Sequence, residues 1–214
     1  MNCYAYMKPH IKKLLVLLKK QYPKAECALN FKNPLELLIA TILSAQCTDI
    51  RVNIVTSKLF KKYKNVKDYA NARLSDFERD IYSTGFYRNK AKNIISTCNI
   101  LHKKYKGRVP KNFDELLKLP GVARKTANCV MGNAFNIPSG VVVDTHVSRI
   151  SQRLGLTKNT DPKKIEEDLI NLLPKSEWIM FSHRLIWHGR KVCDSRRPRC
   201  EICTLNKLCP SSKV

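Results

Sequence analysis

The feature of this sequence that most constrains its fold is a proline–glycine turn between two helical segments. Residues 119–130 read Leu-Pro-Gly-Val-Ala-Arg-Lys-Thr-Ala-Asn-Cys-Val. Pro120 and Gly121 end one helix and turn the chain, and apolar residues then recur at helical spacing over residues 123–135. So short a turn leaves backbone N–H groups at an exposed tip, where they can hold a phosphate. Taken alone, the turn is as typical of a non-catalytic helix-turn-helix corner as of an enzyme.

The remainder of the chain also predicts helices. Ser75 with Glu78, and Asn112 with Glu115, have the spacing of a capping box at a helix N-terminus. No stretch shows the sustained alternation of a half-buried strand, and the short valine run at 141–143 has no partner strand. We therefore predict an all-α fold of about ten helices. Periodicity or capping signals place helices at residues 11–18, 35–45, 49–63, 88–105, 123–135, 145–154 and 161–173.

The charge of the chain points to a polyanionic partner. Its 214 residues include 40 Lys and Arg against 17 Asp and Glu, a formal net charge of +23. Such a surplus favours nucleic acid over an anionic membrane surface, although a ribosome-associated or merely lysine-rich protein has a similar composition. The apolar run near the N-terminus, residues 14–18, is too short for a signal peptide or a membrane span. We therefore expect an intracellular protein with no membrane partner.

Four of the nine cysteines are crowded near the C-terminus. Cys193, Cys200, Cys203 and Cys209 have the spacing C-x6-C-x2-C-x5-C. In a reducing compartment this pattern favours a four-thiolate metal site over disulfides. Structural zinc sites usually offer two short cysteine pairs and this segment has one, so an iron–sulfur cluster is somewhat favoured and zinc stays open. The other cysteines are expected to be buried thiols, namely Cys3, Cys27, Cys47, Cys98 and Cys129.

Many cations surround the four clustered cysteines. A loop held rigid by a metal site and carrying this much positive charge would form a phosphate-binding surface. The cations are Arg190, Lys191, Arg196, Arg197, Arg199 and Lys207.

Three motifs together resemble the endonuclease III family of helix-hairpin-helix DNA glycosylases. They are residues 119–128, the Val-Asp-Thr-His run at 143–146, and the four-cysteine segment, in the family's order and spacing. The resemblance covers residues 14–209 and implies two domains. A six-helix barrel would span 27–138, and residues 1–26 and 139–214 would form a second helical domain. The cysteine spacing also matches the family's [4Fe–4S] site, which would lie in a loop at about 193–209 with a structural, DNA-docking role.

The resemblance further implies base-excision DNA repair. The chain would be a bifunctional N-glycosylase that removes oxidised pyrimidines and cleaves abasic sites by β-elimination. Lys125 matches the lysine that forms a Schiff base at the sugar C1′. We expect it at a helix N-terminus and partly buried, both of which disfavour the ammonium form, whereas the charge of Asp144 would favour that form, so the sequence leaves the net effect open. Asp144 is expected to stabilise the positive charge that develops as the base leaves, and it could equally cap the helix that follows.

Other residues match the family's DNA contacts. Because a base inside a duplex must be flipped out, the vacated space needs a plug, and Gln46 matches that glutamine. Phe86 stands where the family has an apolar wedge, usually aliphatic; packing or helix capping is the alternative for both. Ala123 replaces the second hairpin glycine, and its methyl could lengthen a phosphate contact unless the φ there is negative. The full set of expected contacts is Gln46, Phe86, Gly121, Ala123, Arg124, Thr126, Thr145, His146, Arg190, Arg196 and Arg199.

Two alternatives remain. The adenine-mispair glycosylase relatives share the fold and cluster but lack the lysine at position 125 and carry a further C-terminal domain, whereas this chain ends five residues after Cys209. A non-catalytic zinc-containing DNA-binding protein would explain the charge and the cysteines, but it leaves Lys125, Asp144 and Gln46 unexplained. We expect the glycosylase and lyase, acting as a monomer on double-stranded DNA with a damaged pyrimidine or an abasic site. Its location would be cytoplasmic, with the nucleoid.

Overall fold

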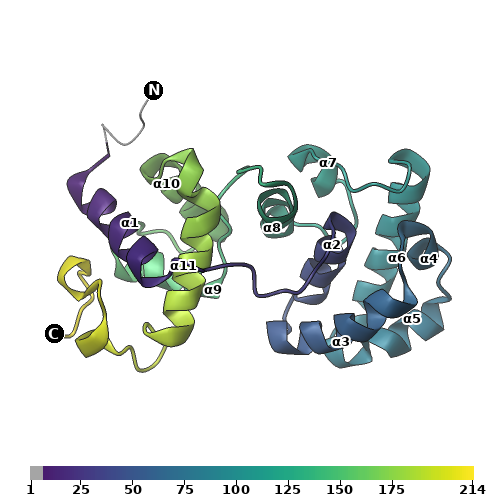
Figure 1. Ribbon diagram of the computed structural model, residues 1–214, viewed down its shortest axis with the longest axis horizontal. Helices are drawn as coiled ribbons and strands as arrows, with labels where there is room; N and C mark the ends of the chain where they lie inside the picture. The colour runs from purple at the N-terminus through teal and green to yellow at the C-terminus, as the bar shows by residue number, and fades with distance from the viewer. Residues whose placement is uncertain (1–6) are drawn as a thin grey trace. The chain divides into compact units, whose positions relative to one another are not determined.

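The computed structural model describes residues 7–214, and every regular element in this range is helical (Figure 1). The all-α prediction is therefore confirmed for the described chain, whereas Cys3 lies outside it. The residues form two compact units. One unit is Cys27–Ile137, and the other combines the chain up to Glu26 with Pro138–Val214.

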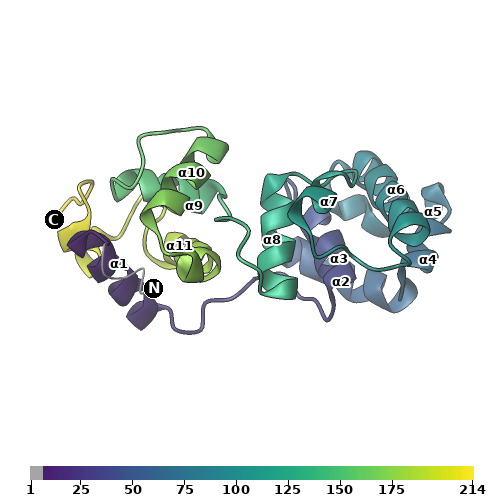
Figure 2. The same ribbon diagram turned by 90° about the horizontal axis from the view of Figure 1, so that it is seen from above.

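The unit Cys27–Ile137 is built around α2, Pro34–Leu43, which is apolar almost all round. Its residues 37–43 are all buried, and the helix packs against α3, α6 and α8 (Figure 2). A helix with no polar face needs neighbours on every side, and this explains its central place. The other elements of the unit are α3 (Asp49–Lys62), α4 (Val66–Ala70), α5 (Leu74–Ile81), the 3₁₀ segment η1 (Tyr82–Thr84), α6 (Tyr87–Lys104), α7 (Phe113–Leu117) and α8 (Arg124–Phe135).

Capping residues set several helix starts in this unit. Asn112 Oδ1 accepts a hydrogen bond from the backbone N–H of Glu115 over 3.0 Å and so caps α7. The predicted box is only half formed, because the Glu115 carboxylate binds other groups instead of the Asn112 N–H. The predicted box at Ser75 is wrong, because α5 begins at Leu74, which makes Ser75 its second residue, and the N-cap, Arg73, makes no capping bond. A full capping box occurs instead at Asn65, where α4 begins.

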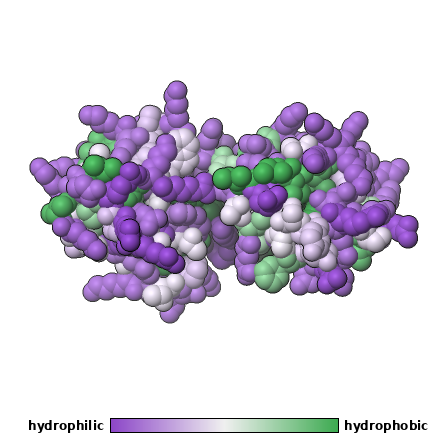
Figure 3. Space-filling model, turned by 90° about the horizontal axis from the view of Figure 1, so that it is seen from below, coloured by the Kyte–Doolittle hydropathy of each residue, from purple (hydrophilic) through white to green (hydrophobic). Residues whose placement is uncertain are grey.

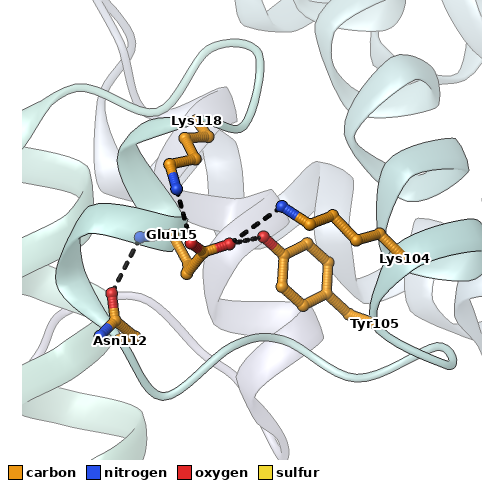
Figure 4. A network of polar contacts seen from close by, with 5 residues as sticks. All are labelled: Lys104, Tyr105, Asn112, Glu115 and Lys118. Atoms are coloured by element: carbon orange, nitrogen blue, oxygen red, sulfur yellow. Dashed lines mark hydrogen bonds and ion pairs between the residues drawn. The ribbon is translucent and has the colours of Figure 1, made fainter.

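The carboxylate of Glu115 ties α7 to the end of α6 (Figure 4). It accepts hydrogen bonds from Lys118 Nζ at 2.6 Å, from Lys104 Nζ at 3.2 Å and from the Tyr105 hydroxyl. These contacts, that with Lys118 first, lower the pKa of Glu115 to about 2. The network fixes α7, which leads directly into the proline–glycine turn.

The second unit is centred on α11, Trp178–Lys191, a helix that the sequence patterns did not predict. It packs against α1 and α9, and Phe181 and Leu185 enter the core of this unit. The C-terminal segment returns to α1, where the hydroxyl of Thr204 bonds the side chain of Gln21 (Figure 2). The remaining elements are α1 (Pro9–Gln21), α9 (Thr145–Arg153), α10 (Pro162–Leu172), η2 (Lys175–Glu177), η3 (Cys200–Ile202) and η4 (Asn206–Leu208).

Hydrophilic side chains cover most of the face drawn in Figure 3 on both units. None of the helices in residues 7–214 has both the length and the apolar character that crossing a bilayer requires.

Candidate active site

The turn between α7 and α8 requires a glycine. Gly121 has a φ of +77°, a conformation that L side chains rarely adopt. A Cβ atom there would also lie 3.0 Å from Asn93 Cβ and 3.1 Å from its Nδ2. The hydroxyl of Thr97 on α6 holds the turn by donating to the carbonyl of Pro120 over 2.8 Å. Ala123, the N-cap of α8, has a φ of −91°, so its methyl group introduces no backbone strain.

Lys125 is the second residue of α8, and its side chain is exposed. The expected partial burial is therefore wrong. Its neighbour Arg124 lies over the ring of Phe113, with 5.0 Å from the guanidinium carbon to the ring centroid, and this joins the starts of α7 and α8. Because Ala123 makes no side-chain capping bond, no side chain covers the first-turn amides as a cap. The helix start thus combines backbone donors, the positive end of the dipole and an accessible amine, with Thr126 half-buried beside them.

Two thiols meet one helical turn after Lys125. The thiols of Cys129 and Cys27 hydrogen-bond to each other, and both residues, which were expected to be buried, are half-buried. Cys129 Sγ also lies 3.6 Å from Asn133 Nδ2 and 3.8 Å from Thr41 Oγ1. The bond from Cys27, with smaller contributions from these groups and the charge of Lys125, lowers the pKa of the Cys129 thiol.

Asp144 is the N-cap of α9. Its Oδ1 accepts a hydrogen bond from the backbone N–H of Val147 over 2.8 Å. The other oxygen, Oδ2, accepts none from the residues that the structure describes. The capping role is therefore present, and the second carboxylate oxygen of this half-buried residue remains available to a ligand. Thr145, the next residue, is exposed.

The start of α9 is packed closely against α11 at Gly189. A Cβ atom there would lie 2.5 Å from Nδ1 of His146 and 3.0 Å from Cδ1 of Ile150, so only a glycine fits. His146 Nδ1 also lies 3.2 Å from Arg149 Nη2, which donates to the carbonyl oxygen of Cys193 over 2.9 Å. One set of contacts therefore connects the first turn of α9 with the cysteine loop.

Gln46 and Phe86 share an unusual backbone conformation. Both are exposed and both have a positive φ, +53° at Gln46 and +47° at Phe86. A left-handed conformation is a genuine outlier for a residue as bulky as phenylalanine, and such strain clusters at functional sites. Phe86 follows Gly85, which also has a positive φ, of +68°. The exposed Tyr82, a residue that the sequence patterns did not single out, has its ring centroid 4.8 Å from that of Tyr87, the residue after Phe86.

The four C-terminal cysteines line one pocket that opens to solvent, and its empty space of about 410 Å³ includes part of that solvent. Its walls include apolar side chains, among them Ile150, Leu154 and Leu205. Arg153, which the sequence patterns did not single out, donates from Nη1 to Cys193 Sγ over 3.1 Å. No three or more His, Cys, Asp or Glu side chains of the described chain converge as ligands of a single ion. Iron–sulfur clusters are held by cysteine thiolates in apolar, hydrogen-bonded surroundings, and in a four-iron cluster each thiolate has its own iron. The residues present fit such a cluster.

The cations of the cysteine loop are exposed. The loop is shaped by Asp194 Oδ1, which accepts from the backbone N–H groups of Arg196 at 2.9 Å and Arg197 at 3.2 Å. Arg199 instead directs its guanidinium back to the carbonyl oxygen of Lys191. The expected contact residues Arg190, Arg196 and Arg199 therefore all lie at the surface, and Arg199 has a partner within the protein.

The chain has close relatives among known proteins. It is 53% identical to Endonuclease III of Synechocystis sp. over 210 residues, which are 98% of this chain and 96% of that protein. It is 49% identical to Endonuclease III of Bacillus subtilis over 189 residues, covering 88% of this chain and 86% of that one.

Solved structures that resemble this chain include proteins of the same kind. A non-covalent Endonuclease III–DNA complex superposes with a TM-score of 0.90 and 46% identity, covering 97% of this chain and 98% of that one. A thermostable thymine-DNA glycosylase superposes with a TM-score of 0.85 and 26% identity, covering 95% of this chain and 96% of that one. Residues 39–175 match the sequence pattern of the HhH-GPD superfamily. The chain therefore belongs to the HhH-GPD superfamily of base excision DNA repair proteins.

Proposed function

We propose that this chain is a DNA glycosylase and abasic-site lyase that removes oxidised pyrimidines, with Lys125 as its nucleophile. Once deprotonated, the exposed Lys125 amine can form a bond with the sugar C1′ as the base departs. The sugar ring then opens, with the C1′–O4′ bond broken and a proton passed from the nitrogen to O4′, and this gives a Schiff base. The Schiff base acidifies C2′, and loss of a C2′ proton expels the 3′ phosphate by β-elimination. The α8 N-terminus and the Gly121 turn supply backbone donors for a DNA phosphate. Its place would then be with the DNA of the cell.

Asp144 is assigned an electrostatic role as well as its cap. A carboxylate near C1′ stabilises the positive charge that grows on the sugar as the base leaves. The cap uses Oδ1, which holds the side chain in one orientation, and Oδ2 remains available to face that charge.

Gln46 is assigned as the plug and Phe86 as the wedge. The strained backbone at both residues supports this assignment, because the left-handed conformation persists only where surrounding structure enforces it. Phe86 is 65% exposed, so the fold gains little from burying its ring, and the ring is accessible to a base step.

The cysteine pocket is assigned to a [4Fe–4S] cluster held by Cys193, Cys200, Cys203 and Cys209. The cluster would cross-link a loop that has little regular structure. Arg149 and Arg153 hold that loop from α9 through the Cys193 and Asp194 carbonyls, and so direct the exposed arginines outward. Zinc would be the competing occupant, and metal analysis of the purified protein distinguishes the two.

The observation that carries the proposal is an accessible lysine at an uncapped helix start that follows a tight glycine turn. The test is borohydride trapping on a duplex that contains an abasic site. Lys125→Gln should abolish the trapped adduct and strand nicking but still bind the duplex, because the hairpin amides and the basic loop are unchanged. Lys103→Gln, at an exposed lysine of α6, is the matched control and should trap normally. If Lys125→Gln still forms the trapped adduct, Lys125 is not the nucleophile and contributes only a phosphate contact.

A further inference from the structure

A buried lysine lies between the two loops assigned to enter the DNA. Lys90, in the first turn of α6, is only 5% exposed. Its Nζ donates to the carbonyl oxygen of Leu43 over 2.9 Å and to that of Thr84 over 2.8 Å. Burial lowers the pKa of Lys90. A neutral amine still has two N–H donors, so both carbonyls keep their partner in either protonation state.

The two carbonyl groups that accept from Lys90 each belong to the last residue of a helix. Leu43 is the last residue of α2, and Thr84 is the last residue of η1. Carbonyl groups at the ends of helices have no partner within the helix and need one elsewhere. Gln46 lies three residues after Leu43, and Phe86 lies two residues after Thr84. The amine of Lys90 therefore joins the two helix ends just before the chain enters each left-handed residue.

We propose that Lys90 is a positioning residue, which fixes the spacing between the Gln46 and Phe86 loops and so allows both side chains to enter one duplex together. Lys90 is buried and touches no DNA itself. The inference rests on the proposed roles of Gln46 and Phe86. Burying an amine is costly unless its donors are satisfied, and an apolar side chain would fill the same space without that cost. A role in joining the two loops explains why the position holds a donor.

The variant that tests this is Lys90→Met, which keeps the bulk of the side chain and removes its donors. A single strand has no base stack for the two side chains to enter, so it reports the chemistry without the insertion. We expect kcat/KM on a lesion-containing duplex to fall by about tenfold or more, because shifts of about 1 Å in a site can cost on the order of 10²-fold. Lyase activity on a single-stranded abasic oligonucleotide should stay at the wild-type level. Lys92→Met, at an exposed lysine of the same helix, should change neither activity.

A double-mutant cycle separates positioning from simple stabilisation. In a Gln46→Ala, Phe86→Ala background, Lys90→Met should cause no further loss on the duplex, because the side chains that it positions are gone. Equal losses on duplex and single strand, or full additivity in the cycle, would overturn the inference. If Lys90→Met unfolds, Lys90→Gln is measured instead; it keeps N–H donors on a shorter chain, and the same duplex-specific loss is expected.

The same variants distinguish a failure of the proposed Gln46 and Phe86 insertion from a failure of the role proposed for Lys90. If Gln46→Ala and Phe86→Ala leave duplex activity unchanged, their proposed insertion fails, and the role of Lys90 fails with it. If they lower duplex activity and Lys90→Met does not, the insertion stands and only the inference about Lys90 is overturned.

Discussion

Arg153 Nη1 donates a hydrogen bond to Cys193 Sγ over 3.1 Å and a second to the carbonyl oxygen of Asp194 over 2.7 Å. Its Nη2 donates to the carbonyl oxygen of Ser195, also over 2.7 Å. One guanidinium at the end of α9 thus holds three successive residues of the cysteine loop. N–H groups directed at a cysteine sulfur are among the factors that tune an iron–sulfur site.

The first prediction concerns this contact. Arg153→Leu removes all three bonds and leaves the carbonyls of the loop without their donor, so the loop should loosen. Purified Arg153→Leu should contain less iron per chain than the wild type, as measured by iron analysis and visible absorbance, and should lose colour faster in the presence of a chelator. Arg197→Leu, at an exposed arginine of the same loop, should retain its iron. Equal iron content in both variants would contradict the role given to Arg153.

The second prediction concerns the charge of the loop. If six to ten phosphates are contacted, DNA affinity should fall by ~10³–10⁵ between about 50 and 200 mM salt. Arg196→Ala should reduce the slope of this dependence by about one unit without changing lesion preference. Arg196 is a cleaner test than Arg199, because the Arg199 guanidinium also supports the loop through the Lys191 carbonyl. The measurement is a fluorescence anisotropy titration over a series of salt concentrations, and binding that is independent of salt would contradict the prediction.

The third prediction is a pH dependence of stability. The folded protein lowers the pKa of Glu115 to about 2, against about 4.3 in an unfolded chain. A lowered pKa stabilises the fold above the unfolded value, and this stabilisation is lost as the pH falls through the folded value. Glu115→Gln should therefore lower the melting temperature at neutral pH, and the difference from wild type should shrink between about pH 5 and 2. Glu78→Gln, at a carboxylate that makes no ion pair in the described chain, is the control. A difference that persists at the acid end would assign the effect to packing.

Local sequence signals predicted much of the fold. The Gly121 turn, the Asn112 cap and the Asp144 cap depend on residues within a few positions of one another, and all three are present. Helix α11 was missed because its apolar and aromatic residues are spread around the helix and its start, at Glu177, makes no capping bond. A helix of this kind is recognisable only from what packs against it.

The functional site, like the fold, was predictable only where the interacting residues are close in the sequence. Lys90 and Arg153 were not singled out, because their partners are distant in the sequence. Leu43 is 47 positions from Lys90, and Cys193 is 40 positions from Arg153. Nothing in the local sequence indicates such pairs. The left-handed backbone at Gln46 was also unpredicted, since neither it nor its neighbours are the glycine or asparagine that usually marks this conformation. Tertiary structure enforces these features.

The fourth prediction concerns the contact between α9 and α11. Gly189→Ala places a Cβ atom where it would lie 2.5 Å from His146 Nδ1, so the imidazole or the helices must move. Overpacking of this kind typically costs about 1–3 kcal/mol. Chemical denaturation should show a loss of that size, and Gly189→Ser should lose at least as much. Because His146 leads through Arg149 to the cysteine loop, iron retention should fall as well. If Gly189→Ala is as stable as the wild type, the contact between α9 and α11 can accommodate a Cβ atom, and the prediction is wrong.

The last prediction tests the charge of Asp144 against its cap. Asp144→Asn keeps an oxygen that can accept from the Val147 N–H, so most of the cap survives while the charge is removed. Base excision should slow by ~10²-fold or more if the carboxylate acts like other groups that stabilise charge in a transition state. Cleavage of a preformed abasic site should suffer less, because no base has to leave.

Asp144→Ala serves as the comparison, since it removes both the charge and the cap. Loss of an N-cap costs about 1 kcal/mol, so Asp144→Ala should have a lower melting temperature than Asp144→Asn. Excision by the two variants should nevertheless be slowed to a similar degree, because both lack the carboxylate. If the loss of excision instead follows the melting temperature, small in Asp144→Asn and large in Asp144→Ala, then Asp144 acts on the reaction only through the start of α9.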